Sequence, residues 1–475
     1  MQAVRRVREP RGVRREREIL DRVQRGEARH EVGQVAAEER LPAGQPHLQR
    51  PVVPEGGDER LDLLVVEDVL AGQPRVDLLR HAVRAAEVAA PPYDVMSRDE
   101  AKQMAAGRPW SFLHISRPEI DLPDDVDPYD AAVYTKGHDN LQQMQAAGIL
   151  QQDAVPGYYV CRLTMGAHVQ TGLVAVASVQ AYNADRIKKH EFTRPVKEQD
   201  RVHQINRLNA QTGPVFLVYP AHEEVDAVLA AAAQTESAVD VTAADGVRHQ
   251  LWLIQDDNQI GVLTDAFAAM PALYVADGHH RSAAAARVAA ERSQGDAEAA
   301  HHYFLSVIFP HDQVSILDYN RLVSDLHGLT VEEFLARVSE QFRVRPLAEP
   351  VKPDQPGVFG MYLRGQWYQL QLRETHHTDD PVAGLDVSLL TDRLIEPILG
   401  IQDPRRDPRI DFVGGIRGLS TLQARVDSGD WAVAFALYPV SVSALMAVAD
   451  SGQVMPPKST WFEPKLADGL VSHLL

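Results

Sequence analysis

A short run of polar residues near the middle of the chain carries side chains suited to chemistry. Residues 277–281 read Asp-Gly-His-His-Arg, between the apolar residues 273–276 and the alanine-rich residues 282–290. This pattern predicts a buried strand, a tight turn at Asp277-Gly278 and the first turn of a helix. The first N–H groups of a helix have no partners within it, and the helix dipole adds positive charge there. We therefore expect a site for a phosphate or carboxylate group, with the Asp277 oxygens beside it for acid/base or metal chemistry.

Charged side chains gather a second time between residues 188 and 207. Glu191 follows His190 directly, and its carboxylate is suited to a general base or an Mg²⁺ ligand. Phosphate-binding candidates in this stretch are Lys188, Lys197, Arg201 and Arg207. A solvated helix face with paired charges would have the same composition, so this structural alternative stays open.

A third cluster lies near the C-terminus, where residues 455–465 read Met-Pro-Pro-Lys-Ser-Thr-Trp-Phe-Glu-Pro-Lys. The prolines restrict the backbone around Lys458, which is followed by two hydroxyl side chains. A lysine before two hydroxyls resembles the end of a phosphate loop. The glycine-rich lead of a Walker A loop is missing, so the stretch is not one. The structural alternative is a tail segment that docks on the core.

The composition narrows the class of protein. The chain has 475 residues, a formal net charge of −18 and a single cysteine, Cys161, within an apolar run. An acidic chain lacks the overall basic footprint of a nucleic-acid-binding protein. No apolar run approaches the ~20 residues that span a bilayer, and the N-terminus lacks the apolar core of a secretory signal. We therefore expect a cytoplasmic protein without nucleic-acid or membrane partners, with Cys161 as a buried strand thiol.

Residue patterns predict both helices and strands. A helix should begin after Ser97, where Glu100 completes a capping box, and another should cover 129–147. Alternation predicts a strand over 110–115, and residues 250–254 and 259–263 read as a hairpin. Further strands are predicted at 157–164, 171–181, 215–219, 303–309, 358–362, 367–372 and 433–437. Further helices are predicted at 330–341, 386–399, 419–426 and 441–449.

This mixture predicts an α+β (mixed α/β) fold rather than a doubly wound sheet. Residues 1–85 hold no Phe, Trp, Tyr, Lys, Ser or Thr, so we expect a poorly structured or wrongly assigned N-terminal extension. Residues 86–350 should form the main domain around the central turn. Residues 351–475 should form a C-terminal α/β region, after a proline-rich connection at 350–356.

Several motifs in order resemble a bacterial and archaeal family known as domain of unknown function 1015. The motifs are Pro-Pro-Tyr-Asp at 91–94, His-Glu-x-Thr at 190–193, Asp-Arg at 200–201, Ala-Asp-Gly-His-His-Arg at 276–281, Met-Pro-Pro-Lys-Ser-Thr at 455–460 and Pro-Lys at 464–465. The resemblance extends from about residue 87 to the C-terminus. It implies no activity by itself.

The central motif is also similar to that of free serine kinases in the ParB/sulfiredoxin-like superfamily. This resemblance implies a ParB/sulfiredoxin-like core around the strand–turn–helix unit. It implies that a nucleotide polyphosphate is held by Gly278, His279, His280 and Arg281. Asp277 would bind Mg²⁺ or accept the proton of the serine hydroxyl. The kinases use a further carboxylate, for which local chemistry makes Glu191 the candidate. A small amino-acid substrate also needs a cation for its own carboxylate, which Lys458 or Arg201 could supply, and the sequence does not decide between them.

Three functions follow as hypotheses. The first is a Mg²⁺-dependent kinase that uses ATP or ADP to phosphorylate free L-serine or a similar hydroxy amino acid. The second is a ParB-like nucleotide-binding regulator without a small acceptor. The third is a phosphatase or other hydrolase that uses the His279–His280 pair. The sequence leaves the nucleotide, the base and the oligomeric state open.

Overall fold

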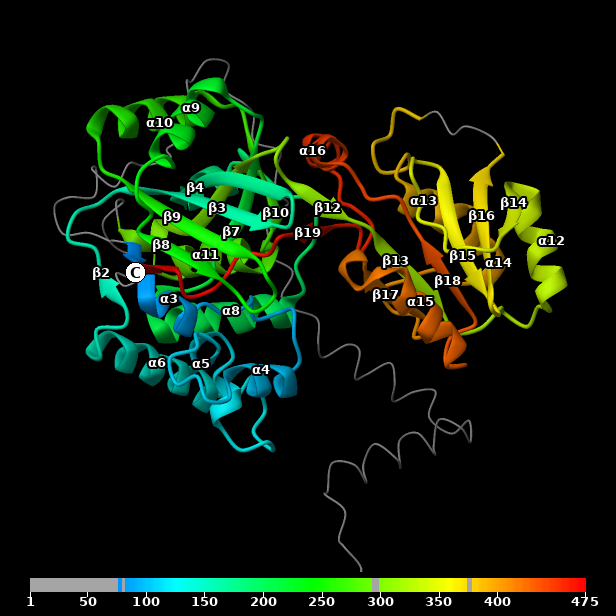
Figure 1. Ribbon diagram of the computed structural model, residues 1–475, viewed down its shortest axis with the longest axis horizontal. Coiled ribbons are helices and arrows are strands. Elements are labelled where there is room, and N and C mark those ends of the chain that lie inside the picture. The colour runs from blue at the N-terminus through cyan, green and yellow to red at the C-terminus, as the bar shows by residue number, and fades with distance from the viewer. Residues whose placement is uncertain (1–75, 79–81, 293–298, 374–377) are drawn as a thin grey trace, which may run out of the picture. The chain divides into compact units, whose positions relative to one another are not determined.

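An eight-stranded sheet carries the central motif in the computed structural model, which describes residues 76–78, 82–292, 299–373 and 378–475 (Figure 1). Its strands, in spatial order, are β5 (Ile187–Lys188), β10 (Leu273–Asp277), β7 (Val215–Tyr219), β11 (Tyr303–Pro310), β4 (His168–Ser178), β3 (Tyr158–Met165), β9 (Arg248–Ile254) and β8 (Val239–Thr242). β10 runs parallel to β5 and β11 runs parallel to β7, whereas the other pairs are antiparallel. The mixed α/β class predicted from the sequence is confirmed.

Alternating side chains of the strands enter two separate cores, because successive residues of a strand point to opposite faces. On β3, Tyr158 and Val160 pack in one core, whereas Tyr159 and Cys161 pack in the other. Helices α9 (Glu223–Ala232) and α10 (Asp257–Ala269) cover the first face, and the N-terminal helices cover the second (Figure 1). Those N-terminal helices are α3 (Ala82–Val88), α4 (Arg98–Ala105), α5 (Leu113–Ser116) and α6 (Ala131–Ala146).

Burial raises the pKa of Cys161 to about 12, so the expected buried thiol is inert.

A second sheet of six antiparallel strands forms from later residues. Its strands, in spatial order, are β14 (Phe342–Leu347), β16 (Gln366–Leu372), β15 (Val358–Leu363), β18 (Val433–Ala436), β13 (Tyr319–Val323) and β17 (Ile410–Gly414). The helices of this region are α12 (Val331–Gln341), α13 (Asp386–Leu390), a π-helical turn (Thr391–Ile395), α14 (Glu396–Leu399), α15 (Gly418–Asp427) and α16 (Val442–Asp450). None of the described helices is both long and apolar enough to cross a membrane.

The last residues of the chain pair with strands formed much earlier. β19 (Trp461–Glu463) pairs with β12 (Ser315–Leu317). β20 (Val471–Leu474) lies between β1 (Val76–Leu78) and β6 (Ala210–Gln211), in a small sheet completed by β2 (Gln151–Gln152). The division at residue 350 stays a prediction, with β13 and β14 in the six-stranded sheet although they precede it. Most of the expected extension, residues 1–75 and 79–81, lies outside the described residues.

Two local predictions are wrong. Residues 110–115 do not form a strand, because Phe112, Leu113 and Ile115 are all buried and the segment turns into α5. Residues 259–263 belong to α10 rather than to a hairpin. The Asp256 side chain caps that helix by accepting from the Gln259 N–H at 3.0 Å. The helices that begin after Ser97 and within 129–147 are confirmed. The strands predicted in the two large sheets are also confirmed, except that β4 ends at Ser178 and residues 179–181 belong to helix α7 (Val179–Asn183).

The centre of the large sheet yields a stability prediction. A Cβ atom added at Gly172 on β4 would meet the carbonyl oxygen of Ile308 on the neighbouring strand β11. We expect Gly172→Ala to lower the free energy of unfolding by at least about 2 kcal/mol, because backbone must move. Gly261→Ala is the matched control: that position lies within α10 with open space around it, so alanine should be neutral or stabilising by up to ~1 kcal/mol. Urea unfolding of the two variants measures both, and equal stabilities would contradict the packing argument.

Candidate active site

The central motif forms a strand, a left-handed turn and a helix, as its sequence predicts. β10 is buried between β5 and β7 and ends at Asp277, Gly278 adopts φ +97°, and α11 (His279–Glu291) begins at the next residue. A left-handed backbone favours glycine, and a Cβ atom at Gly278 would also lie 3.1 Å from Nε of Arg281. The glycine therefore lets the strand pass directly into the helix. The N-terminus of α11 faces a cavity lined by the motif itself.

The side chains of the motif take different directions. Asp277 forms an ion pair with Lys465, with 2.8 Å between Nζ and Oδ2. His280 accepts a hydrogen bond from the backbone N–H of Arg194 at 3.0 Å, and Arg281 donates to the carbonyl of Pro214. His279 is buried, 5% exposed, and its ring packs edge to face against that of His190, with 4.5 Å between the centroids. The imidazole rings of His279 and His280 therefore have different neighbours and do not act as one pair.

Nearby cations keep the Asp277 carboxylate ionised. Burial alone would raise the pKa of Asp277, but the Lys465 ammonium and the Arg281 guanidinium outweigh it and lower that pKa. A carboxylate of this kind is a weak base at neutral pH. It remains a strong partner for a cation.

Two adjoining cavities meet at the turn. The inner chamber, about 280 Å³, surrounds the turn, and the outer chamber, about 410 Å³, adjoins it toward helix α8 (Pro195–Leu208). The residues that line both chambers are Tyr93, Asp94, Glu191, His280 and Lys458. The chambers are therefore parts of one cleft, of the size range of small-molecule sites.

The structure brings all of the predicted site residues to this cleft. Asp277, Gly278, His279 and Arg281 line the inner chamber, and Arg201 lines the outer one, beside the shared residues. The six motifs at 91–94, 190–193, 200–201, 276–281, 455–460 and 464–465 each contribute lining residues. Of the phosphate-binding candidates between 188 and 207, Lys188 and Arg207 do not line the cleft. Lys188 pairs with Asp450 at 2.7 Å, and Arg207 is an exposed residue of α8.

Arg201 already contacts two side chains of the protein, Tyr93 and Asp200. Its guanidinium lies 3.9 Å from the Tyr93 ring centroid and pairs with Asp200 at 2.8 Å. Asp200 also accepts a hydrogen bond from the Tyr134 hydroxyl at 3.0 Å. Part of the charge of Arg201 is therefore already neutralised by the wall of the outer chamber.

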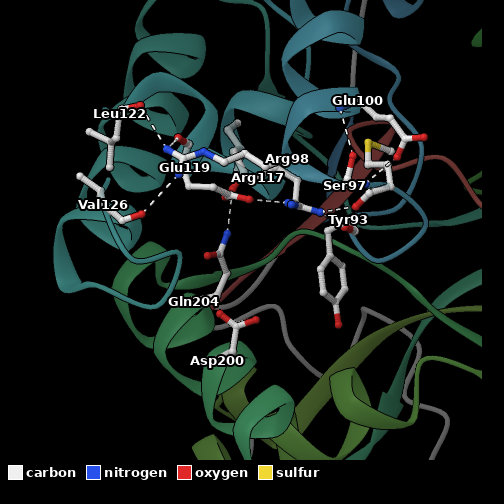
Figure 2. Close-up of polar contacts among 12 residues, drawn as sticks. Tyr93, Ser97, Arg98, Glu100, Arg117, Glu119, Leu122, Val126, Asp200 and Gln204 are labelled. Atoms are coloured by element: carbon white, nitrogen blue, oxygen red, sulfur yellow. Dashed lines mark hydrogen bonds and ion pairs between the residues drawn. The ribbon is translucent and has the colours of Figure 1, made fainter. Parts of the chain in front are cut away.

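Arg117 holds the loop that supplies Tyr93 and Asp94, and Arg98 holds a separate segment at 119–126 (Figure 2). Arg117 donates to the backbone carbonyls of Tyr93 and Met96, both at 2.7 Å, and to the Glu119 carboxylate at 2.6 Å. Arg98 donates to a run of carbonyls at Glu119, Leu122, Pro123, Asp124 and Val126. The capping box of Ser97 and Glu100 starts α4 beside them. The loop is thus fixed by side chain–backbone hydrogen bonds rather than by a sheet.

Lys458 is presented to the cleft in a left-handed backbone conformation, φ +57°. Arg321, 2% exposed, donates to the carbonyls of Lys458 at 3.0 Å and Pro457 at 3.4 Å, and also to that of Tyr319. Burial lowers the pKa of Arg321 to about 10. A non-glycine residue in this region is strained, and such strain concentrates at functional positions.

The sequence alone assigned no role to several residues of the cleft. They include Asp94, Arg194, Lys465 and Asp468, of which Lys465 and Asp468 lie in or just after the C-terminal motifs. Asp468 is 2% exposed and lines a small recess of about 30 Å³ with Arg281 and Arg201. Burial raises the pKa of Asp468 to about 7, although Arg281 opposes the shift.

The buried Asp468 predicts a pH dependence of stability. Between about pH 4 and pH 7 the folded chain keeps the Asp468 proton, whereas the unfolded chain, with its ordinary pKa of 3.8, has lost it. The unfolded state then binds fewer protons, so stability falls as the pH rises through this window. As the pH rises from 4 to 8, we expect the free energy of unfolding of Asp468→Asn to increase by roughly 2 to 4 kcal/mol relative to that of the parent chain.

Urea unfolding of the two proteins across this range measures the difference. Buried histidines such as His190, whose pKa burial lowers to about 4, give the opposite slope but contribute equally to both proteins. A stability difference that does not change with pH would show that Asp468 keeps its charge in the fold.

A comparison of the sequence with known protein families identifies the family of the chain. The sequence model described as "Protein of unknown function (DUF1015)" matches residues 73–388, more than half of the chain. No curated protein matches the chain.

The similar solved structures include a free serine kinase in complex with AMP, a conserved hypothetical protein from Pyrococcus furiosus and C-terminally truncated SbnI from Staphylococcus aureus. Their identities with this chain are 12%, 13% and 12%, and their TM-scores are 0.31, 0.31 and 0.34. The alignments cover 61%, 62% and 62% of this chain and 86%, 93% and 85% of those chains. On the family match, the protein belongs to the DUF1015 family, as its ordered motifs indicated.

Proposed function

We propose that the cleft binds a nucleotide with Mg²⁺ and transfers a phosphoryl group to a small hydroxy compound, with free L-serine as the first candidate. The observation that carries the proposal is the N-terminus of α11, which opens at Gly278 into a cleft where cationic side chains gather. Those cationic side chains are Arg194, Lys197, Arg281, Lys458 and Lys465. Phosphoryl transfer depends mainly on such positioned positive charge.

The inner chamber suits the phosphates. Backbone N–H groups at a helix start bind phosphate oxygens, and the dipole of α11 favours their negative charge. Lys458 reaches this chamber from one side and Arg281 lies at its base. Asp94, Asp277 and Asp468 raise the pKa of Arg281 more than burial lowers it, so this guanidinium stays charged.

The residues present fit a magnesium ion. Asp277 supplies an ionised carboxylate whose Oδ2 is held by Lys465, which leaves Oδ1 to contact a cation. Mg²⁺ commonly binds one or two carboxylates together with substrate phosphates. When bound, such an ion would neutralise charge on the phosphate chain.

Glu191 is the better placed of the two candidate bases. Its side chain is exposed to the cleft and borders both chambers. The pocket walls raise the pKa of Glu191, whereas Lys458 opposes the shift, so this carboxyl is a stronger base than Asp277. In the proposed reaction Glu191 takes the hydroxyl proton while the acceptor oxygen bonds to phosphorus and the bridging oxygen leaves with the nucleotide.

An amino-acid acceptor needs a cation for its own carboxylate. Of the two anchors considered from the sequence, Arg201 is already paired with Asp200, whereas Lys458 is exposed at the border of the two chambers. We therefore assign this contact to Lys458, whose position at the border of the two chambers also lets it contact the phosphates. A hydrolase that relies on the His279–His280 pair has less support, because the His279 ring packs against His190 whereas His280 accepts from the Arg194 N–H.

Nucleotide binding is the first prediction of this proposal. We expect ATP or ADP with Mg²⁺ to bind the whole chain, and Lys458→Met to weaken binding about ten- to a hundredfold, because a charge-assisted contact is lost. Lys352→Met, at an exposed lysine outside the cleft, is the matched control and should bind as the parent does. Titration calorimetry measures all three proteins. Absence of binding by any nucleotide would overturn the proposal.

Turnover is the second prediction. We expect the protein with ATP or ADP, Mg²⁺ and L-serine to form O-phosphoserine, detected by phosphorus NMR. Asp277→Asn and Glu191→Gln should each lower the rate at least about a hundredfold, because each removes a charge or a base from the reacting groups. Nucleotide binding without any phosphorylated product would favour the nucleotide-binding regulator instead.

A further inference from the structure

Three potential metal ligands meet beneath the central turn. His190 follows the short strand β5, Glu191 is the next residue, and His279 is the first residue of α11. One ligand atom from each of the three side chains lies within 4.8 Å of the others. The two imidazole rings pack edge to face, with 4.5 Å between their centroids. β5 and β10 are neighbours in the sheet, which brings the ends of the two strands together.

The imidazole nitrogens of this cluster are buried without hydrogen-bond partners. Within the described residues, both ring nitrogens of His190 and Nε2 of His279 lack a partner of hydrogen-bond geometry. The side chains are 1% and 5% exposed. A buried polar atom left without a hydrogen-bond partner destabilises the fold, so three such atoms in one place call for an explanation.

We infer that His190, Glu191 and His279 bind a divalent transition-metal ion of the Zn²⁺ type. Imidazole nitrogens are typical ligands of Zn²⁺, whereas Mg²⁺ prefers an all-oxygen shell. Two histidines and one glutamate form an established ligand set for zinc with a fourth position open. The open position would face the inner chamber, which all three residues line.

The surroundings suit this role. Both imidazole rings are buried, so packing fixes the positions of their nitrogen atoms. The Val275 carbonyl lies near the His190 ring but outside hydrogen-bond geometry, and a small rotation of the ring would let it orient a metal-bound imidazole. The backbone carbonyl of His190 accepts from the Met455 N–H at 2.8 Å, which fixes the segment in place.

The exposed Glu191 side chain would complete the site by a small movement. Ligands around a tetrahedral ion with bonds of about 2.1 Å lie about 3.4 Å apart, closer than the 4.8 Å limit of the present cluster. The histidines are held by packing, whereas Glu191 is solvent-exposed and free to rotate toward them. This site goes beyond the proposed phosphotransferase, because it requires neither nucleotide nor acceptor. It describes a state in which the Glu191 carboxylate binds the ion and does not serve as the base.

Titration of the whole, chelator-treated chain with Zn²⁺ alone tests the inference. We expect one ion per chain by elemental analysis, and visible absorption of a tetrahedral Co²⁺ complex when Co²⁺ is the probe. His190→Phe and His279→Phe keep the ring pair but remove a lone pair, and Glu191→Gln keeps the shape of the carboxylate. Each should weaken Zn²⁺ binding at least tenfold. Mg²⁺ alone should not displace the bound ion.

The matched control is His249→Phe. His249 on β9 is also a buried histidine, 2% exposed, but it does not belong to the cluster. This variant should bind Zn²⁺ as the parent does, and thermal unfolding in chelator shows whether each variant folds. Less than one ion per chain at saturation, or equal binding by the parent and Glu191→Gln, would overturn the inference. Because no nucleotide is present, a failure here is distinct from a failure of the proposed phosphotransfer.

Discussion

The ion pair between Asp277 and Lys465 joins the C-terminal segment to the turn at the centre of the chain. The two residues are 188 positions apart, and their nitrogen and oxygen atoms lie 2.8 Å from each other. Neither side chain is well solvated, so removal of one partner would leave the other charge poorly compensated. The same contact holds the third motif cluster against the inner chamber. β19 and β20, on either side of Lys465, pair with strands that are distant in the sequence. The ion pair and these strand pairs together hold the C-terminal segment against the rest of the fold.

Local charge in the cleft differs from the charge of the whole chain. The net charge of −18 gives no hint of a cationic surface, yet lysine and arginine side chains converge around the turn. Each buried cation is matched by a nearby carboxylate, as Arg201 is by Asp200 and Arg281 by Asp94 and Asp277. Arg194, Lys197 and Lys458 are exposed, and of these three only Lys458 borders both chambers.

Three arginines position loops near this site in the same way, by donating hydrogen bonds to backbone carbonyls. Arg98, Arg117 and Arg321 each direct a guanidinium at several backbone carbonyls of a loop. A planar group with five donors can satisfy carbonyls that no helix or sheet would pair. The loops at 93–97 and 455–460 can therefore carry functional side chains in conformations that regular structure does not allow. The left-handed backbone of Lys458 is one result.

The sequence by itself determined the local parts of the site. The apolar strand, Asp-Gly turn and alanine-rich helix at 273–290 follow from burial, the conformational freedom of glycine and helix propensity, and the capping box at Ser97 follows from hydrogen bonds three residues apart. Such interactions are short in range, so the pattern predicts them. The error at 259–263 arose where a helix and a hairpin fit the same short apolar run, and the cap at Asp256 decided it.

Only the tertiary structure decided which motifs meet and where their side chains point. Strand pairing brings β5 beside β10, which places His190 against His279 and separates that ring from its neighbour His280. The return of the C-terminal segment supplies Lys458 and Lys465, and the recess it closes buries Asp468. These contacts join residues far apart in the chain. Their energies depend on packing, burial and charge compensation across the whole fold, which no local pattern of residues contains.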